Sequence, residues 1–196
     1  MDAELIRDLL TLRDRDQETR TRLLAGGRLY GGYDDDMQAV HRDNARRLDA
    51  IVQQHGWPGL SLVGLEGCRA AWLIAQHSNC TPDLQRNFLA AMTQAAEAGE
   101  VPARQAAFLT DRIRFNEGKP QVYGTVLDWG EDGELRCDLD DPAAVDARRA
   151  AVGLPPYQDD LPKHRQDVNA EGGSAPADLA DYRRQQEDWA KAVGWR

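Results

Sequence analysis

One apolar segment, residues 66–79 with the sequence EGCRAAWLIAQHSN, constrains the fold more than any other part of the chain. Its middle turns, from Ala70 to Ala75, contain no polar residue. A helix that is apolar all round normally lies inside a domain, because none of its faces is suited to water. We therefore expect this helix at the centre of the core, and we expect Gln76 and His77 at its end to meet polar groups.

Further helical patterns flank this segment on both sides. Apolar residues recur every three or four positions over 2–25, over a helix ending near 55, and over 81–98 and 103–115. Alternating residues at 121–127, a turn at 131–133 and a return strand at 134–139 predict a β-hairpin within 120–139. The sequence thus predicts a mainly α fold, a compact multi-helix domain with one small β-hairpin and a C-terminal helix.

The length fits one domain of ordinary size, so we expect residues 1–154 to form a single helical core that includes the hairpin. Residues 155–176 are rich in proline, glycine and charge, which predicts an extended connection that contributes little to stability. An amphipathic pattern over 177–196 predicts a last helix that docks back on the core.

Charge and composition exclude several classes of partner. A net charge of −9 argues against non-specific binding to nucleic acid, and equally against an anionic membrane surface.

The chain opens with Met-Asp-Ala-Glu rather than with a signal region, so we expect a cytoplasmic protein. Only three of the 24 basic residues are lysines, a usage typical of GC-rich coding DNA that indicates a bacterial source. Three cysteines without a C-x-x-C pair argue against a disulfide framework or a structural zinc site.

Polar residues interrupt the apolar stripes of the first two predicted helices. Asp16 and Arg20 lie four residues apart and can pair, either as an ion pair at the edge of the core or as a charged pair lining a pocket. In the second helix, His41 is interpreted as a satisfied, partly buried histidine. Asn44 is either a structural hydrogen-bonding residue or a ligand-binding one.

Later in the chain, Asp111 is flanked by aromatic residues of its own helix and is followed directly by Arg112. On the predicted hairpin, Gln121 and Tyr123 share one face because strand side chains alternate between faces. This face offers hydrogen-bonding groups, whereas the opposite face is apolar.

Several short motifs occur in a fixed order along the chain. They are Gly56-Trp57-Pro58, Gln76-His77, Leu109-Thr110-Asp111-Arg112, Gln121-Val122-Tyr123-Gly124-Thr125 and 148–154, together with Asp16-Gln17 and Asn44. Through them the chain resembles, over about 5–157, a bacterial family filed as a domain of unknown function. The resemblance implies a single domain and carries no activity, cofactor or catalytic residue.

His77 is the best candidate for proton transfer, because imidazole titrates near neutral pH and a carboxylate can orient it. That carboxylate is either Asp111 or Asp16, and Asp111 is preferred. The expected catalytic residues are His77, Asp111 and Tyr123. The expected substrate-binding residues are Asp16, Arg20, Asn44, Gln76, Arg112 and Gln121. We further predict that Asp16, His77, Asp111 and Tyr123 converge in space, since buried polar groups need partners.

These assignments predict an enzyme that acts without a cofactor on a polar small molecule or peptide, by hydrolysis, elimination or cyclisation. The alternative is a ligand-binding or interaction module whose polar cluster is structural. No metal is expected, because the sequence has no H-x-H, H-E-x-x-H or E-x-x-H pattern. A site built from His41, His77 and a carboxylate stays open as an alternative. No G-x-S-x-G motif indicates a serine nucleophile.

Overall fold

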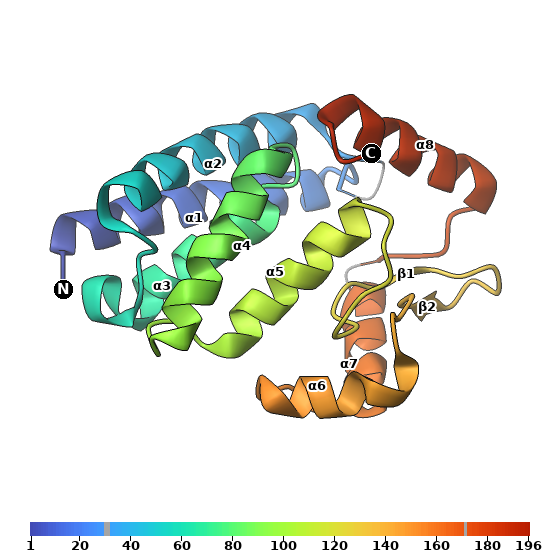
Figure 1. The fold of residues 1–196 in the computed structure, drawn as a ribbon. Coiled ribbons are helices and arrows are strands. Elements are labelled where there is room, and N and C mark those ends of the chain that lie inside the picture. The colour runs from blue at the N-terminus through green and yellow to red at the C-terminus, as the bar shows by residue number, and fades with distance from the viewer. Residues whose placement is uncertain (30–31, 171) are drawn as a thin grey trace. The chain divides into compact units, whose positions relative to one another are not determined.

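The computed structural model describes residues 1–29, 32–170 and 172–196, and it confirms a mainly α fold with one small hairpin and a C-terminal helix (Figure 1). The chain forms two compact units, Met1–Ala106 and Ala107–Arg196. The boundary between the units falls inside one helix, α5 (Ala103–Asn116). That residues 1–154 form one helical domain stays a prediction.

The first unit is built from four long helices and the first turn of α5. They are α1 (Ala3–Ala25), α2 (Asp35–His55), α3 (Leu60–His77) and α4 (Pro82–Glu97). Helix α1 packs against α2 and α3, and α2 also packs against α3 and α4 (Figure 1). These are the helices that the apolar periodicity predicts.

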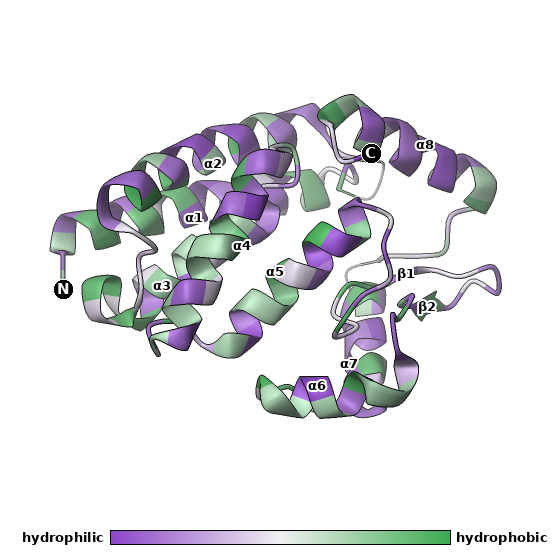
Figure 2. Ribbon diagram, in the orientation of Figure 1, coloured by the Kyte–Doolittle hydropathy of each residue, from purple (hydrophilic) through white to green (hydrophobic). Residues whose placement is uncertain are grey.

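Capping groups and apolar stripes explain where α1 and α2 form. The side chain of Asp2 accepts hydrogen bonds from the first backbone N–H groups of α1, and Asp34 does the same for α2. Purple and green segments alternate along both helices in Figure 2, as expected for helices with one apolar face. The buried stripe of α1 consists of Leu5, Leu9, Leu12, Asp16, Thr19 and Leu23, and that of α2 of Met37, Val40, His41, Asn44, Ala45 and Leu48.

Helix α3 is the central helix that the sequence predicts. The backbone of Gly64 has φ = 66° and interrupts the helix near its start, so the continuous part begins close to the predicted residue 66. Cys68, Ala70, Ala71 and Ile74 are buried. The side chain of Trp72 is only half-buried, so this helix is less enclosed than its composition suggests.

The second unit contains the end of α5 and several short elements. They are β1 (Asp128–Trp129), β2 (Leu135–Arg136), a 3₁₀ turn η1 (Pro142–Ala144), α6 (Val145–Ala151), α7 (Tyr157–Ala170) and α8 (Leu179–Val193). Strands β1 and β2 are antiparallel, with Asp128 opposite Arg136 and Trp129 opposite Leu135. The hairpin therefore exists, but it is shorter than predicted. Residues 121–127 form a loop instead of the long first strand that we expected.

The predicted extended connection at 155–176 is also corrected, because it contains α7. Its start is fixed by tertiary contacts: the backbone N–H of Tyr157 donates to Asp146, and Asp160 lies 2.6 Å from the guanidinium of the fully buried Arg149. Pro162 lies inside the helix. A proline there normally disfavours a helix, and this composition is why the sequence indicated an extended chain.

The last helix, α8, forms where it was predicted and contacts residues of the second unit. The Tyr182 hydroxyl donates to Asp128 at 2.9 Å, and Nε of Arg196 donates to the carbonyl of Asn116 at 3.1 Å. Ala190 and Trp195 are buried. Across the described residues, no helix is both long enough and apolar enough to cross a lipid bilayer.

Candidate functional site

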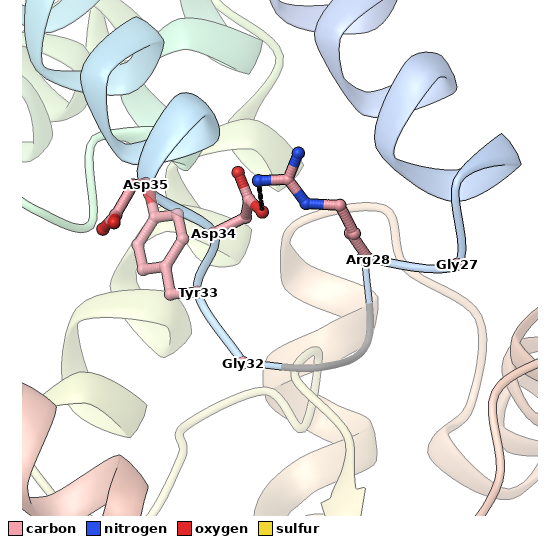
Figure 3. A pocket seen from close by; sticks show the side chains of 6 residues that line it. All are labelled: Gly27, Arg28, Gly32, Tyr33, Asp34 and Asp35. Carbon is pink, nitrogen blue, oxygen red and sulfur yellow. Dashed lines mark ion pairs between the residues drawn. The ribbon is translucent and has the colours of Figure 1, made fainter.

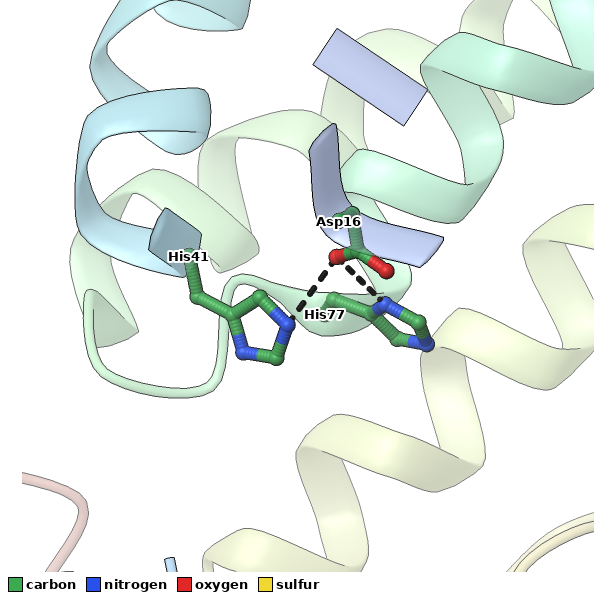
Figure 4. A group of neighbouring side chains, drawn as sticks. All are labelled: Asp16, His41 and His77. Carbon is green, nitrogen blue, oxygen red and sulfur yellow. Dashed lines mark hydrogen bonds and ion pairs between the residues drawn. The ribbon is translucent and has the colours of Figure 1, made fainter. Parts of the chain in front are cut away.

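Three polar side chains from three helices meet in the first unit: Asp16 from α1, His41 from α2 and His77 from the last residue of α3 (Figure 4). Asp16 and His41 belong to the buried stripes of their helices, where the surrounding positions are apolar. Because α1, α2 and α3 pack against one another, a polar residue on the inner face of each can reach the others. We call these three residues the triad.

The carboxylate of Asp16 is the centre of the triad. Its Oδ2 lies 2.8 Å from Nδ1 of His77 and 3.0 Å from Nε2 of His41. Its Oδ1 accepts a hydrogen bond of 2.9 Å from the side chain of Gln17. The two imidazole rings are 5.1 Å apart between centroids. Both histidines thus contact the same carboxylate oxygen, Oδ2 of Asp16, from different sides.

Burial is uneven across the triad. Asp16 is fully buried and His41 is 7% exposed, whereas the side chain of His77 is 27% exposed. A buried carboxylate and a buried imidazole are expensive unless they are paired, and here they are neighbours of each other. His77 is therefore the member of the triad that a dissolved molecule can reach.

The contacts set the protonation states of the two buried groups. Burial raises the pKa of Asp16, but the close contacts with His41 and His77 outweigh it and bring this pKa well below its usual range. Burial lowers the pKa of His41, the adjacent Asp16 carboxylate opposes this, and the charge of His77 lowers it further. The favoured state has an ionised Asp16 and a neutral His41.

Tyr33 is a fourth residue at this cluster. Its hydroxyl is hydrogen-bonded to Nδ1 of His41, the ring nitrogen that does not face Asp16. Among the described residues, Nε2 of His41 has no hydrogen bond of good geometry, although the Asp16 carboxylate is only 3.0 Å away. His41 is thus held by Tyr33 on one side and presents a buried nitrogen to Asp16 on the other.

Tyr33 also lines an open hollow of about 410 Å³ at the connection between α1 and α2 (Figure 3). The other lining residues are Gly27, Arg28, Gly32, Asp34 and Asp35. Arg28 and Asp34 form an ion pair of 2.6 Å across it. None of its described lining residues belongs to the triad, but Tyr33 contacts His41 as well.

The other predicted site residues of the first unit have different positions. Asn44 is buried and donates to the backbone carbonyl of Leu12 at 3.0 Å, so it joins α2 to α1, as the structural interpretation expected. Gln76 is buried beside His77, and its backbone carbonyl accepts a hydrogen bond from Gln85. Arg20 lies one helical turn beyond Asp16 on α1 and is half-buried.

In the second unit, Asp111 organises a loop. Its two carboxylate oxygens accept hydrogen bonds from the backbone N–H groups of Val122, Tyr123 and Thr125 and from the Thr125 hydroxyl, at 2.8–3.2 Å. Burial raises the pKa of Asp111, and these hydrogen bonds oppose the rise. Gly124, in the middle of the loop, has φ = 67°, which favours glycine. The backbone N–H groups of this loop donate to the Asp111 carboxylate instead of to a neighbouring strand, so residues 121–127 do not form the predicted strand.

Gln121 completes this loop. Its side chain is buried, accepts from the backbone N–H groups of Thr125 and Val126, and donates to the carbonyl of Val126 at 2.7 Å. Tyr123 is half-buried and contacts Asp111 through its backbone, and Arg112 is half-buried on α5. The structure thus brings Asp16 to His77 and Asp111 to Tyr123, each within its own unit. Convergence of all four stays a prediction.

None of the cysteines has the environment of a catalytic nucleophile. Burial raises the pKa of Cys68 to about 11 and that of Cys137 to about 12, and burial raises the pKa of Cys80 as well. A thiol with such a pKa is protonated near neutral pH and reacts slowly. The cysteines therefore serve as packed residues.

Residues 3–168 match the model of a family of unknown function, DUF6624. The chain belongs to this family. The resemblance over 5–157 is thereby confirmed, and the DUF6624 region includes both the triad and the Asp111 loop. Neither the curated proteins nor the solved structures yielded a match to the chain.

Two residues of the cluster were not among the expected catalytic or substrate-binding residues: His41, which the sequence named only for the open metal alternative, and Tyr33. His41 carries a signal, because it interrupts an apolar stripe just as Asp16 does. Tyr33 follows a glycine-rich connection and carries no sequence signal of its own. Its contact with His41 depends on the path of the chain between α1 and α2.

Proposed function

We propose that this chain is an enzyme that acts on a polar small molecule or peptide by acid/base chemistry, with His77 as the proton-transferring residue. The observation that carries the proposal is the 2.8 Å contact between Nδ1 of His77 and the carboxylate of the buried Asp16. Asp16 takes the orienting role for which the sequence offered either Asp111 or Asp16.

An imidazole that donates its Nδ1 proton to a carboxylate presents the lone pair of Nε2 on the opposite edge of the ring. The carboxylate fixes the ring and stabilises the positive charge that forms when Nε2 takes up a proton. Among the described residues, none is hydrogen-bonded to Nε2 of His77. Together with the exposure of His77, this supports proton exchange with a bound molecule.

The neighbouring groups favour a polar substrate. Residues four apart on a helix share a face, so Arg20 lies on the side of α1 that carries Asp16. A guanidinium binds a carboxylate or phosphate through two parallel hydrogen bonds. Arg20 and Gln76 are therefore the proposed substrate-binding residues nearest in sequence to the acid/base pair.

The alternative, a module with a structural polar network, is favoured in the second unit by one observation. Every oxygen of Asp111 and the whole amide of Gln121 are used to fold the loop at 121–126. The proposed function does not need Asp111 or Tyr123 in a catalytic role.

A ligand-induced thermal-shift screen tests the proposal. The probes are amino acids, dipeptides, dicarboxylates and sugar phosphates, since a ligand that binds only the folded state raises its melting temperature. Each probe that stabilises the protein is then followed by NMR for chemical conversion. We expect at least one probe that stabilises the parent protein and is converted by it.

The matched variants are His77→Gln and, as the control, His55→Gln, because His55 is an exposed histidine in the last turn of α2. We expect His77→Gln to keep the fold and to lose about 10²–10⁴-fold in rate. His55→Gln should behave like the parent. Normal conversion by His77→Gln, or a cooperative fold that no polar probe stabilises, overturns the acid/base assignment.

A further inference from the structure

The triad presents three donor atoms of the kinds that bind transition metals: one carboxylate oxygen and two imidazole nitrogens. Oδ2 of Asp16, Nε2 of His41 and Nδ1 of His77 all lie within 4.8 Å of one another. Ligand atoms at about 2.1 Å from one ion are about 3.0 Å apart at the right angles of an octahedral site and about 3.4 Å apart at the tetrahedral angle. The two oxygen–nitrogen distances of 2.8 Å and 3.0 Å are close to the octahedral separation.

A second observation points to a cation rather than to hydrogen bonds alone. Nε2 of His41 is buried, and it has no hydrogen bond of good geometry among the described residues although a carboxylate oxygen is 3.0 Å away. A proton on this buried nitrogen does not point at the nearby carboxylate oxygen, so it makes only a weak hydrogen bond. A metal ion on the axis of this nitrogen satisfies it and the carboxylate together.

The residues that hydrogen-bond to these donors, Tyr33 and Gln17, are also suited to a metal site. A metal-binding histidine usually makes a hydrogen bond through its other ring nitrogen, which fixes the ring and the tautomer. In His41 that nitrogen, Nδ1, is hydrogen-bonded to the Tyr33 hydroxyl. The second oxygen of Asp16 accepts a hydrogen bond from Gln17. Hydrogen bonds from Tyr33 and Gln17 thus orient two of the three donors, and the partly exposed His77 provides an entry path.

We propose that Asp16, His41 and His77 bind one divalent first-row transition-metal ion through Oδ2, Nε2 and Nδ1. Two imidazoles with one carboxylate favour ions such as Zn²⁺, Co²⁺, Mn²⁺ and Fe²⁺ over Mg²⁺ and Ca²⁺, which prefer all-oxygen sites. Three protein ligands leave at least one coordination position for water or a ligand.

The inference goes beyond the proposed function and takes up the site of His41, His77 and a carboxylate that the sequence left open as an alternative. No local spacing pattern marks this site, because each ligand comes from a different helix. A bound ion takes the position of the Nδ1 proton of His77. The acid/base pair and the metal complex are therefore alternative states of the same three side chains.

The test is titration of the full chain, first treated with EDTA and then dialysed, with Co²⁺ and Zn²⁺. Calorimetry measures the affinity and the number of ions bound, and visible absorption reports the ligand field of Co²⁺. We expect one ion per chain. Asp16→Asn, His41→Gln and His77→Gln should each weaken binding by at least about 10–100-fold. His55→Gln and Cys80→Ser should bind like the parent, which excludes an exposed imidazole and a thiol as the ligands.

Tyr33→Phe keeps all three donors, so it tests the site even where a ligand variant does not fold. We expect it to bind the ion less tightly than the parent, because His41 loses its partner. Absence of binding by the folded parent, or unchanged binding by folded His41→Gln, overturns the inference. The acid/base proposal is judged separately, by conversion of a probe in EDTA-treated protein, so each proposal can fail alone.

Discussion

His41 is buried among groups that all affect its charge: Asp16 and His77 on one side and the Tyr33 hydroxyl on the other. Burial is the largest influence and lowers the pKa of His41 below its ordinary value of 6.5. The unfolded chain then binds a proton more readily than the folded one as the pH falls below this value. The contribution of His41 to folding stability therefore decreases as the pH falls from neutral toward the lowered pKa.

We predict that the free energy of unfolding of EDTA-treated protein decreases between about pH 7 and pH 5, and that His41→Gln makes this decrease shallower. Urea denaturation at a series of pH values measures the slope. Gln54→Ala is the control and should keep the parent slope, because Gln54 is exposed on the same helix and does not titrate. An equal slope in the parent and His41→Gln contradicts the prediction.

Asp111 offers a second test at a single residue. Its carboxylate receives three backbone N–H groups and one hydroxyl, and Asp111→Asn would turn an amide N–H₂ group toward some of these donors. We predict a loss of about 1–3 kcal/mol in the free energy of unfolding, the usual cost of leaving buried donors unsatisfied. Urea denaturation measures it. Asp138→Asn, at an exposed carboxylate, should change stability little.

The polar positions of the sequence predicted part of this arrangement. Asp16 and His77 interrupt or end apolar stripes, and such residues need partners, so their involvement follows from pattern alone. The partner of each could not be predicted. His77 contacts Asp16, and Asp111 contacts the backbone of a loop, because those contacts depend on how helices and loops pack.

At the scale of elements, the helices were predictable and the segments fixed by tertiary contacts were not. Helices α1 to α5 follow from apolar periodicity and from caps such as Asp2 and Asp34. The loop at 121–127 has the composition of a strand, but the Asp111 carboxylate takes up its N–H groups. Helix α7 has the composition of a linker, but the buried Arg149 pairs with its first turn.

The pair between Arg149 and Asp160 gives the prediction for α7. Arg149 is fully buried, and its guanidinium also donates to the backbone carbonyls of Tyr123 and Pro155. Removing Asp160 leaves a buried charge without its counter-ion.

We predict that Asp160→Asn lowers the free energy of unfolding by about 1–3 kcal/mol, less than for a fully buried pair because Asp160 is partly exposed. The neighbouring Asp159→Asn is the matched control, since Asp159 is exposed in the same turn. Thermal and urea unfolding measure both. Equal stability of the two variants would mean that the pair between Arg149 and Asp160 does not stabilise the protein.

At the scale of the whole molecule, the division at Ala106 separates two sets of interactions. The triad, its partners Tyr33 and Gln17, and the apolar stripes of α1 to α3 all belong to the first unit. The Asp111 loop, Arg149 and α8 belong to the second. Helix α5 is shared, because its first turn lies in the first unit and the rest in the second.

The first turn of α5 completes the environment of α3. Gln105 is buried, its backbone carbonyl accepts a hydrogen bond of 3.2 Å from the indole of Trp72, and its side chain lies 3.7 Å from the thiol of Cys68. A fragment of the first unit therefore needs the first turn of α5 to keep the Gln105 contacts with α3. A helix cut after one turn is not stable by itself, since isolated helices need about 12–15 residues to be even marginal in water.

We predict that a fragment of residues 1–118, which keeps all of α5, folds into a helical unit with cooperative thermal unfolding. A fragment of residues 1–102 lacks the Gln105 contacts and should melt at a clearly lower temperature, because the Trp72 indole loses its partner and α3 loses cover. Circular dichroism and calorimetry measure both fragments. Non-cooperative melting of 1–118 would mean that the first unit depends on residues beyond α5, whereas equal melting of the two fragments would contradict the role assigned to Gln105.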